Sequence, residues 1–147
     1  MSAADLDVLT TPGVRMGCDL VEPSEIEESL RVFGVRFTDR VFTERELRAC
    51  TGSDAIARLA ARFAAKEAVA KLFADPDLAI PPTEIEVVGS GGAPALELHG
   101  SLADRARRDG WRDLRVSLSH TRCHAMAVVC VSCPGTVSPG SGARPAQ

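Results

Sequence analysis

The chain has 147 residues, of which 45% are hydrophobic and 25% are charged, and this length fits one domain with a sizeable core. Its formal net charge of −3 argues against bulk nucleic-acid binding. Tyrosine is absent and aromatic residues make up only 4% of the chain, which argues against platforms for stacking bases.

Local signals divide the first half of the chain into a loose arm, one strand and several helical segments. Pro23 suits the first turn of a helix, and Thr43 with Glu46 forms a capping box at the start of another. A long helical pattern then stops before Pro76. The expected segments are an arm at 1–13, a strand at 14–21, a helix at 23–32, a short connector at 37–42, a helix at 43–50 and a long helix at 54–73.

The second half of the chain is predicted to be rich in strands. Gly110 suits the cap that follows a helix, and apolar and polar residues alternate over 114–121, as in a half-buried strand. The expected segments are a strand at 84–88, a glycine turn at 89–93, a strand at 94–99, a helix at 101–109 and strands at 114–121 and 124–132. We expect an α+β domain over 14–133, with helices packed on an antiparallel sheet, and a disordered tail at 134–147.

Glu67 lies in the middle of the apolar stripe predicted for the long helix. At about 100° per residue, the residues that share its face are Ile56, Ala60, Phe63, Ala64, Ala70 and Ala74. An unpaired buried charge costs several kcal/mol, so this carboxylate needs a partner, a proton or a bound cation. An internal ion pair with Lys71, four residues further on, and a metal ion are both open.

Asp19 is the second acid that stands out, near the end of the first predicted strand. Two carboxylates that converge on one point leave Mg²⁺ with open positions for water and phosphate oxygens. Arg62, Lys66 and Lys71 supply positive charge near Glu67. Composition alone favours a turn-forming role for Asp19 over a metal ligand, so both interpretations are kept.

The segment 116–121 is a second candidate for binding. Alternation puts Ser117, Ser119 and Thr121 on one face of the strand, and His120 lies at its end beside a turn. Hydroxyls, backbone amides and an imidazole can hold phosphate oxygens, although a polar strand end with a solvated histidine has the same pattern. A serine nucleophile is less attractive because neighbouring strand residues point to opposite faces.

Two further segments have both a functional and a plain interpretation. The glycine turn at 89–92 lacks the ending of a P-loop, so it is either a simple hairpin turn or a close backbone approach to a nucleotide. Arg31, Arg36 and Arg40, with Phe37 between them, either dock an acidic protein surface or form a solvated helix edge.

The five cysteines predict neither a disulfide framework nor a zinc site. Cys130 and Cys133 form one Cys-x-x-Cys pair in a valine-rich run, and no second pair supplies four ligands. We expect them to be strand residues rather than a redox pair. The chain has no signal-like start and no apolar run of about 18 residues, so a soluble cytoplasmic protein is expected.

Three sequence blocks occur in an order that is typical of one enzyme family. They are Gly17-x-Asp19 followed by Glu22, the block Arg62-Phe63-Ala64-Ala65-Lys66-Glu67-Ala68-x-x-Lys71, and Val116-Ser117-Leu118-Ser119-His120-Thr121. The connecting Arg36-Phe37-x-x-Arg40-x-Phe42-Thr43 and Gly92-x-Pro94 also fit. Over about 14–131 the chain resembles the holo-acyl-carrier-protein synthase group of 4′-phosphopantetheinyl transferases.

The resemblance implies a reaction and a role for each matching residue. The family moves phosphopantetheine from coenzyme A to a serine of an apo acyl carrier protein and releases adenosine 3′,5′-bisphosphate. Asp19 and Glu67 would hold Mg²⁺ on the pyrophosphate, Lys71 would meet the transferred phosphate, and Glu67 or a metal-bound water would take the serine proton. The further implied coenzyme A contacts are Arg62, Lys66, Gly92, Pro94, Ser119 and His120, and the implied carrier contacts are Arg31, Arg36, Phe37 and Arg40.

The family also implies an assembly and raises a question about the carrier. A one-lobed member is expected to be a homotrimer with each site at a subunit boundary. Six residues after the metal aspartate the family commonly has an arginine, where this chain has Glu25 in an acidic run. Acidic surfaces repel, so we expect a specialised polyketide or peptide carrier rather than the usual fatty-acid carrier. A non-catalytic carrier-binding module and a coenzyme A pyrophosphate hydrolase stay open as alternatives.

Overall fold

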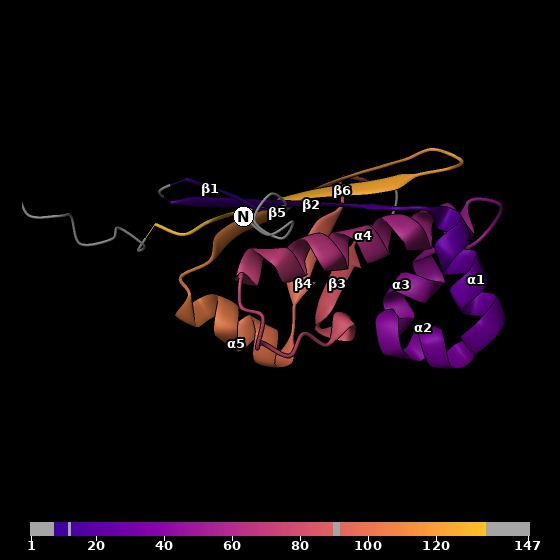
Figure 1. Ribbon diagram of the computed structural model, residues 1–147, viewed down its shortest axis with the longest axis horizontal. Coiled ribbons are helices and arrows are strands. Elements are labelled where there is room, and N and C mark those ends of the chain that lie inside the picture. The colour runs from indigo at the N-terminus through magenta and orange to yellow at the C-terminus, as the bar shows by residue number, and fades with distance from the viewer. Residues whose placement is uncertain (1–7, 12, 90–91, 135–147) are drawn as a thin grey trace, which may run out of the picture.

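The computed structural model describes residues 8–11, 13–89 and 92–134, with only the backbone of 8–11 (Figure 1). Helices and antiparallel strands are both present, which confirms the α+β class. The elements are β1 (Val8–Thr11), β2 (Val14–Val21), α1 (Pro23–Phe33), α2 (Val35–Val41), α3 (Glu44–Ala49), α4 (Ala55–Phe73), β3 (Ile85–Val88), β4 (Ala95–Leu98), α5 (Gly100–Arg108), β5 (Arg112–His120) and β6 (Ala125–Ser132).

A four-stranded antiparallel sheet, in the order β1-β2-β6-β5, forms one layer of the molecule. The long helix α4 lies against one face of this sheet, and the other helices and the β3–β4 hairpin lie on that same side (Figure 1). The core between sheet and helix consists of alternate strand residues and the small side chains of α4. Asp19 of β2 and Leu118 of β5 both pair with Ala127 of β6, so the three are at one level of the sheet.

Gly17 sets how closely α4 approaches β2. A Cβ atom at this position would lie only 2.6 Å from the backbone oxygen of Ala68. The helix presents small residues here, and Ala64 and Ala68 are fully buried. The absence of a side chain at Gly17 therefore lets the backbone of α4 touch β2. The contact lies beside Glu67 in the helix and two residues before Asp19 in the strand.

Two segments differ from the sequence prediction. Residues 8–11 form β1 where a loose arm was expected, and Gly13, with a φ of +85°, lies in the turn that joins β1 to β2. The expected connector at 37–42 instead lies mostly in helix α2. Gly34 ends α1 with a φ of +55° and lets a second helix begin at the next residue, a conformation that glycine adopts readily. Residues 1–7, the middle of the glycine turn and 135–147 are outside the described residues, so the tail prediction stays a prediction.

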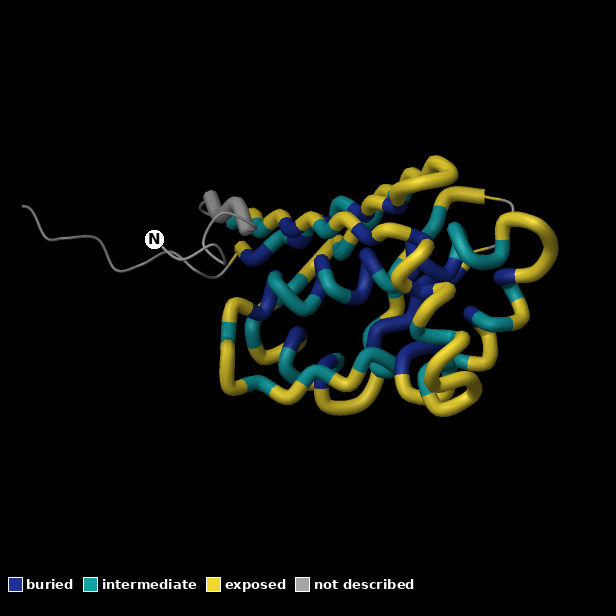
Figure 2. The backbone as a smooth tube through the Cα atoms, turned by 45° about the vertical axis from the view of Figure 1, so that its right-hand side comes forward, coloured by how far each residue is buried: buried dark blue, intermediate teal, exposed yellow. Residues whose placement is uncertain are grey.

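The sheet face opposite α4 is covered by no element of the described chain and displays apolar side chains. Val14, Met16 and Leu20 of β2 and Met126 of β6 are all exposed on it. The alternation of buried and exposed residues along the strands is visible in Figure 2. Within the described residues, no helix has the length and apolar character that crossing a membrane requires.

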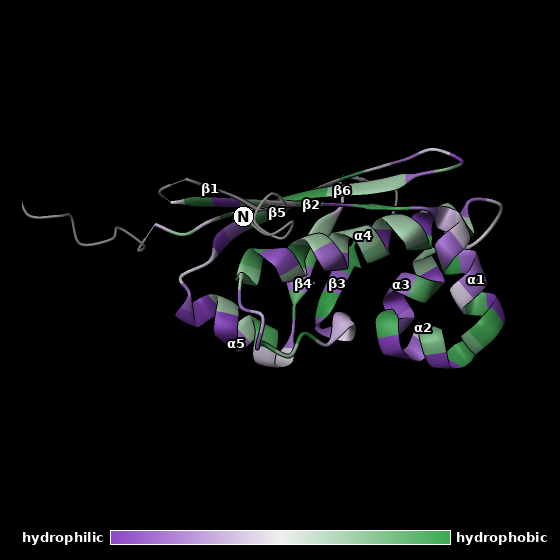
Figure 3. Ribbon diagram, in the orientation of Figure 1, coloured by the Kyte–Doolittle hydropathy of each residue, from purple (hydrophilic) through white to green (hydrophobic). Residues whose placement is uncertain are grey.

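A second exposed apolar group lies where α1 meets α2. Val32, Phe33 and Val35 are consecutive large apolar residues around Gly34, and Phe33 is 55% exposed. Figure 3 shows hydrophobic colouring at this corner of the molecule, beside hydrophilic turns of both helices. We call Val32, Phe33 and Val35 the apolar corner.

Candidate active site

The structure brings together three of the predicted site residues, namely Asp19, Glu67 and Lys71. Asp19 is on the face of β2 that looks toward α4, because Gly17 and Val21 on either side of it are buried there. Lys71 Nζ donates to Asp19 Oδ1 at 3.1 Å and to the carbonyl oxygen of Cys18 at 3.0 Å. Glu67 lies one helical turn before Lys71, on the same side of α4.

The charges in this cluster influence one another. Partial burial raises the pKa of the Glu67 carboxyl, the neighbouring Asp19 carboxylate raises this pKa further, and Lys71 opposes both effects. Asp19 and Glu67 are thus close enough to repel each other, and the single ammonium group of Lys71 compensates only part of their charge. Two neighbouring carboxylates supply oxygen ligands for Mg²⁺, and the lysine beside them supplies positive charge for a phosphate group.

Glu67 does not lie in the centre of the buried face of α4, contrary to the prediction. The buried positions of the helix centre on the face of Ala61, Ala65 and Ala68, and they reach only as far as Ala60 and Ala64 on the side of Glu67, which is itself partly buried. The periodicity was misleading because small alanines occur all around this helix and do not distinguish its faces. The outcome favours a site, because a carboxylate at the border with solvent is accessible to a ligand.

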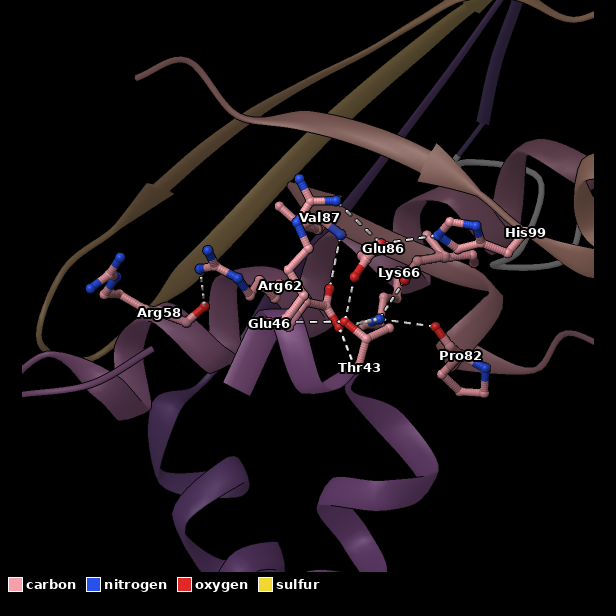
Figure 4. A network of polar contacts seen from close by, with 11 residues as sticks. Thr43, Glu46, Arg58, Arg62, Lys66, Pro82, Glu86, Val87 and His99 are labelled. Atoms are coloured by element: carbon pink, nitrogen blue, oxygen red, sulfur yellow. Dashed lines mark hydrogen bonds and ion pairs between the residues drawn. The ribbon is translucent and has the colours of Figure 1, made fainter. Parts of the chain in front are cut away.

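Lys66, predicted to bind the cofactor, is instead one of the most buried side chains of the structure, with 2% of its surface exposed. Its three donors are matched by three acceptors (Figure 4): Glu46 Oε2 at 2.8 Å, the carbonyl oxygen of Pro82 at 2.9 Å, and the carbonyl oxygen of Ile85. Burial lowers the pKa of Lys66, and Glu46 counteracts this shift. No donor of Lys66 remains for a phosphate, so the structure gives it a role in the core.

The partner of Lys66 ties three elements together. Glu46 is fully buried, and beside Lys66 it accepts hydrogen bonds from the backbone N–H groups of Thr43 and Val87, both at 2.9 Å. The Thr43 bond belongs to the predicted capping box, which is confirmed. The sequence indicated the cap but not the ion pair, because Glu46 and Lys66 are 20 residues apart and no local pattern links them.

Arg62 is buried on the side of α4 that also carries Lys66 and lies near Cys50, rather than beside Glu67. Its Nη1 donates to the carbonyl oxygen of Arg58 at 3.3 Å, and its buried Nε has no hydrogen-bond partner among the described residues. A guanidinium has five N–H donors, so this side chain has capacity for an anion. It would need to turn toward solvent to use that capacity.

Ser119 and His120 lie at the end of β5, where Ser119 is exposed as the alternation predicted and His120 is exposed because the strand ends there. Because β5 is two strands from β2, these residues are about 10 Å to the side of Asp19 in the sheet. A groove of about 480 Å³ runs beside His120, between the start of α1, the start of α4 and the β5–β6 turn. It is lined by Pro23, Ser24, Glu27, Ser53, Asp54, Ile56, Ala57, His120, Thr121 and Arg122. One chain therefore does not bring His120 into contact with the acid pair.

The remaining predicted residues are at two other places. Gly92 and Pro94 lie between β3 and β4, just before β4 begins, and Gly92 is exposed. Of the predicted carrier contacts, Arg36 and Arg40 are exposed on α2, and Arg31 forms a bidentate pair with Glu28 at 2.6 and 2.8 Å. Phe37 instead packs edge-on against Phe42, with ring centres 5.9 Å apart.

Comparisons with known proteins show the family of the chain. The sequence model of the family described as "4'-phosphopantetheinyl transferase superfamily" matches residues 15–126. The holo-[acyl-carrier-protein] synthase of Desulfovibrio desulfuricans is 42% identical over 118 residues, which covers 79% of this chain and 94% of that protein.

Solved structures of such synthases have the same fold. The holo-[acyl-carrier-protein] synthase from Neisseria meningitidis matches with a TM-score of 0.72 and 26% identity, over 83% of this chain and 98% of that one. A complex described as "Chronobacterium ammoniagenes ACPS-CoA complex" matches with a TM-score of 0.71 and 30% identity, over 81% of this chain and 96% of that one. The resemblance drawn from the three sequence blocks is thereby confirmed.

Proposed function

The chain belongs to the 4′-phosphopantetheinyl transferase superfamily, and we propose that it transfers 4′-phosphopantetheine from coenzyme A to a serine of an apo acyl carrier protein. The observation that carries this proposal is the contact between Asp19 and Lys71 next to a half-buried Glu67 with a raised pKa. In the reaction, the serine oxygen forms a bond to the β-phosphorus of coenzyme A, the pyrophosphate P–O bond breaks, and adenosine 3′,5′-bisphosphate leaves.

Asp19 and Glu67 are the residues that would hold Mg²⁺. Their carboxylate oxygens are the hard ligands that this ion prefers. Burial and then the repulsion by Asp19 raise the pKa of Glu67, and a bound cation would relieve that repulsion. When bound, Mg²⁺ supplies charge neutralisation for the pyrophosphate and its leaving oxygen.

The side chains of the cluster have separate tasks in this proposal. Lys71 is held by Asp19 and the Cys18 carbonyl, so its ammonium group is fixed where a transferred phosphate would gain charge. Glu67, or a water held by the ion, is the proton acceptor for the serine hydroxyl, because this carboxylate is only partly buried and lies beside the Asp19–Lys71 contact where the transferred phosphate would bind. Positioning and charge neutralisation are what phosphoryl transfer needs most, and no covalent intermediate on the protein is required.

We further propose that the site is completed at a boundary between subunits of a homotrimer. Two observations support this. Ser119 and His120 are about 10 Å to the side of Asp19 within one chain, so a nucleotide held by the acid pair meets them more easily from a neighbouring copy. The uncovered sheet face also presents Met16, Leu20 and Met126, which association would bury.

The surface at α1 and α2 supports a specialised carrier as the acceptor. Glu25 and its acidic neighbours would repel a strongly acidic carrier, whereas the apolar corner lies beside the exposed Arg36 and Arg40. A carrier whose docking helix combines one or two apolar residues with a moderate acidic charge fits this surface better than a highly acidic one.

Incubation with coenzyme A, Mg²⁺ and a panel of apo carriers, followed by mass spectrometry of each carrier, tests the proposal. A transferase adds one phosphopantetheine, of about 340 Da, to a carrier that has its serine, and adds nothing when that serine is changed to alanine. Consumption of coenzyme A without modified carrier would indicate a hydrolase. Complex formation without either change would indicate a binding module, and both of these outcomes contradict the proposal.

A further inference from the structure

A second group of metal-ligand side chains lies on the β3–β4 hairpin, in a different sheet from Asp19. Glu86 of β3 pairs in register with Glu97 of β4, and His99 follows Glu97 by two residues, so the three share one face of the hairpin. One ligand atom from each lies within 4.8 Å of the others. We propose that Glu86, Glu97 and His99 bind a transition-metal dication such as Zn²⁺, at a site separate from the Asp19–Glu67 pair.

The donor set and its spacing favour such an ion. One imidazole nitrogen and two carboxylate oxygens match zinc chemistry, whereas Mg²⁺ and Ca²⁺ prefer oxygen donors alone. Tetrahedral zinc ligands at about 2.0–2.1 Å from the ion lie about 3.3 Å from one another. His99 Nε2 is already 3.0 Å from Glu86 Oε2, and the exposed side chain of Glu97 can turn to close the remaining gap.

Glu86 has the outer support that metal-binding carboxylates commonly have. Thr43 Oγ1 donates to Glu86 Oε1 at 2.7 Å, which leaves Oε2 to face His99 (Figure 4). Thr43 is itself fixed, because it is the N-cap residue of α3 and donates its backbone N–H to Glu46. A buried carboxylate whose second oxygen is oriented by a hydrogen bond binds a metal with less loss of freedom than a mobile surface acid.

Arg45 is the cation that now lies beside the two glutamates. Carboxylates directly opposite each other on paired strands are destabilising unless a positive charge compensates them. Arg45 Nη1 is 3.9 Å from Glu86 Oε2 and 3.5 Å from Glu97 Oε2, both longer than the roughly 2.7–2.9 Å of a strong charged hydrogen bond. Arg45 is 57% exposed and can swing into solvent, so a dication with three ligands would displace it.

Zinc titrations of the full chain, monitored by calorimetry, test the site. They are done in excess Mg²⁺, which occupies the Asp19–Glu67 pair. Cys18 and Cys123 are exposed thiols that also bind zinc, so all proteins carry Cys18→Ser and Cys123→Ser. We expect one ion per chain, and at least about tenfold weaker binding in His99→Ala and in Glu97→Gln. The matched control is His124→Ala, which removes another exposed histidine and should leave the affinity unchanged.

Arg45→Gln separates a metal site from a purely structural ion-pair network. Removing a competing cation should strengthen zinc binding, whereas a network that only holds α3 to the hairpin gives no gain in zinc affinity and a lower melting temperature. Co²⁺ absorption spectra, recorded on the same variants, report whether nitrogen and oxygen ligands are used. The proposal is overturned if no zinc binds, if binding survives both His99→Ala and Glu97→Gln, or if Arg45→Gln fails to strengthen it.

Discussion

Replacing Gly17 with alanine is the most direct test of how the fold builds the acid pair. The new Cβ would lie 2.6 Å from the Ala68 backbone oxygen, whereas ordinary van der Waals contact begins at 3.4 Å, so α4 and β2 must separate by about 0.8 Å (3.4 − 2.6). The obstructing atom belongs to the helix backbone, so no side-chain rotation relieves the overlap. The separation occurs between the elements that carry Asp19 and Glu67.

The expected size of the effect follows from this displacement. Overpacking of a well-packed core costs about 1–3 kcal/mol, which for a domain of this size lowers the melting temperature by several degrees. A misplacement of about 1 Å between catalytic groups costs about 100-fold in rate. Gly17→Ala should therefore remain folded at room temperature and lose transfer activity far beyond its loss of stability.

The assay is the rate of phosphopantetheine addition to a carrier, measured beside a thermal unfolding curve. Gly92→Ala is the matched stability control, because a Cβ atom at Gly92 would meet nothing within 4 Å. Its melting temperature should stay at the wild-type value. If Gly17→Ala melts and turns over like the wild type, the close approach of helix and strand is not what positions the acids.

Three further substitutions test separate parts of the structure. Glu67→Gln should slow transfer by about 10²–10⁴-fold and raise the free energy of unfolding in metal-free buffer at neutral pH. The pKa of Glu67 is raised in the folded protein, so its ionised form destabilises the fold at neutral pH. The stability gained by Glu67→Gln should therefore vanish as the pH falls through the ordinary value of 4.5. Unfolding curves from pH 4 to 8 in which the two proteins do not become equally stable at low pH contradict the assignment. Lys66→Met should cost about 3–5 kcal/mol in urea unfolding because it leaves Glu46 buried without its counter-ion, and a loss below about 1 kcal/mol would argue against the buried pair. Glu25→Arg should lower the KM for an acidic fatty-acid carrier while kcat changes little, and an unchanged KM would remove the basis for a specialised carrier.

Local chemistry was sufficient to predict most elements of this fold. The strand β2 has the predicted limits, and the capping box of Thr43 and Glu46 starts α3 as expected, because both depend on neighbours in the sequence. Helix α2 was missed because it has only seven residues and follows α1 after a single glycine, so it has no room for a start signal of its own.

The candidate site was predictable in its residue types but not in all of its geometry. Asp19, Glu67 and Lys71 lie together, as the three sequence blocks suggested, because α4 packs directly on β2. The partner of Lys66 could not be predicted, since Glu46 reaches it only through tertiary packing. The cluster of Glu86, Glu97 and His99 depends on hairpin register and gave no motif in the sequence.

Lys66 and Glu67 are consecutive residues of α4, but Lys66 lies in the core and Glu67 lies at the border with solvent. Successive helix residues differ by about 100°, so fixing the direction of Lys66 fixes the direction of Glu67. Lys66 is held in the core by three acceptors from α3 and the segment around β3, which determines the rotation of α4 about its axis. Gly17 determines the distance of that helix from β2. Rotation and distance together place the Glu67 carboxylate beside Asp19 at the border with solvent, so the buried ion pair of Lys66 and Glu46 sets the geometry of the proposed metal-binding pair.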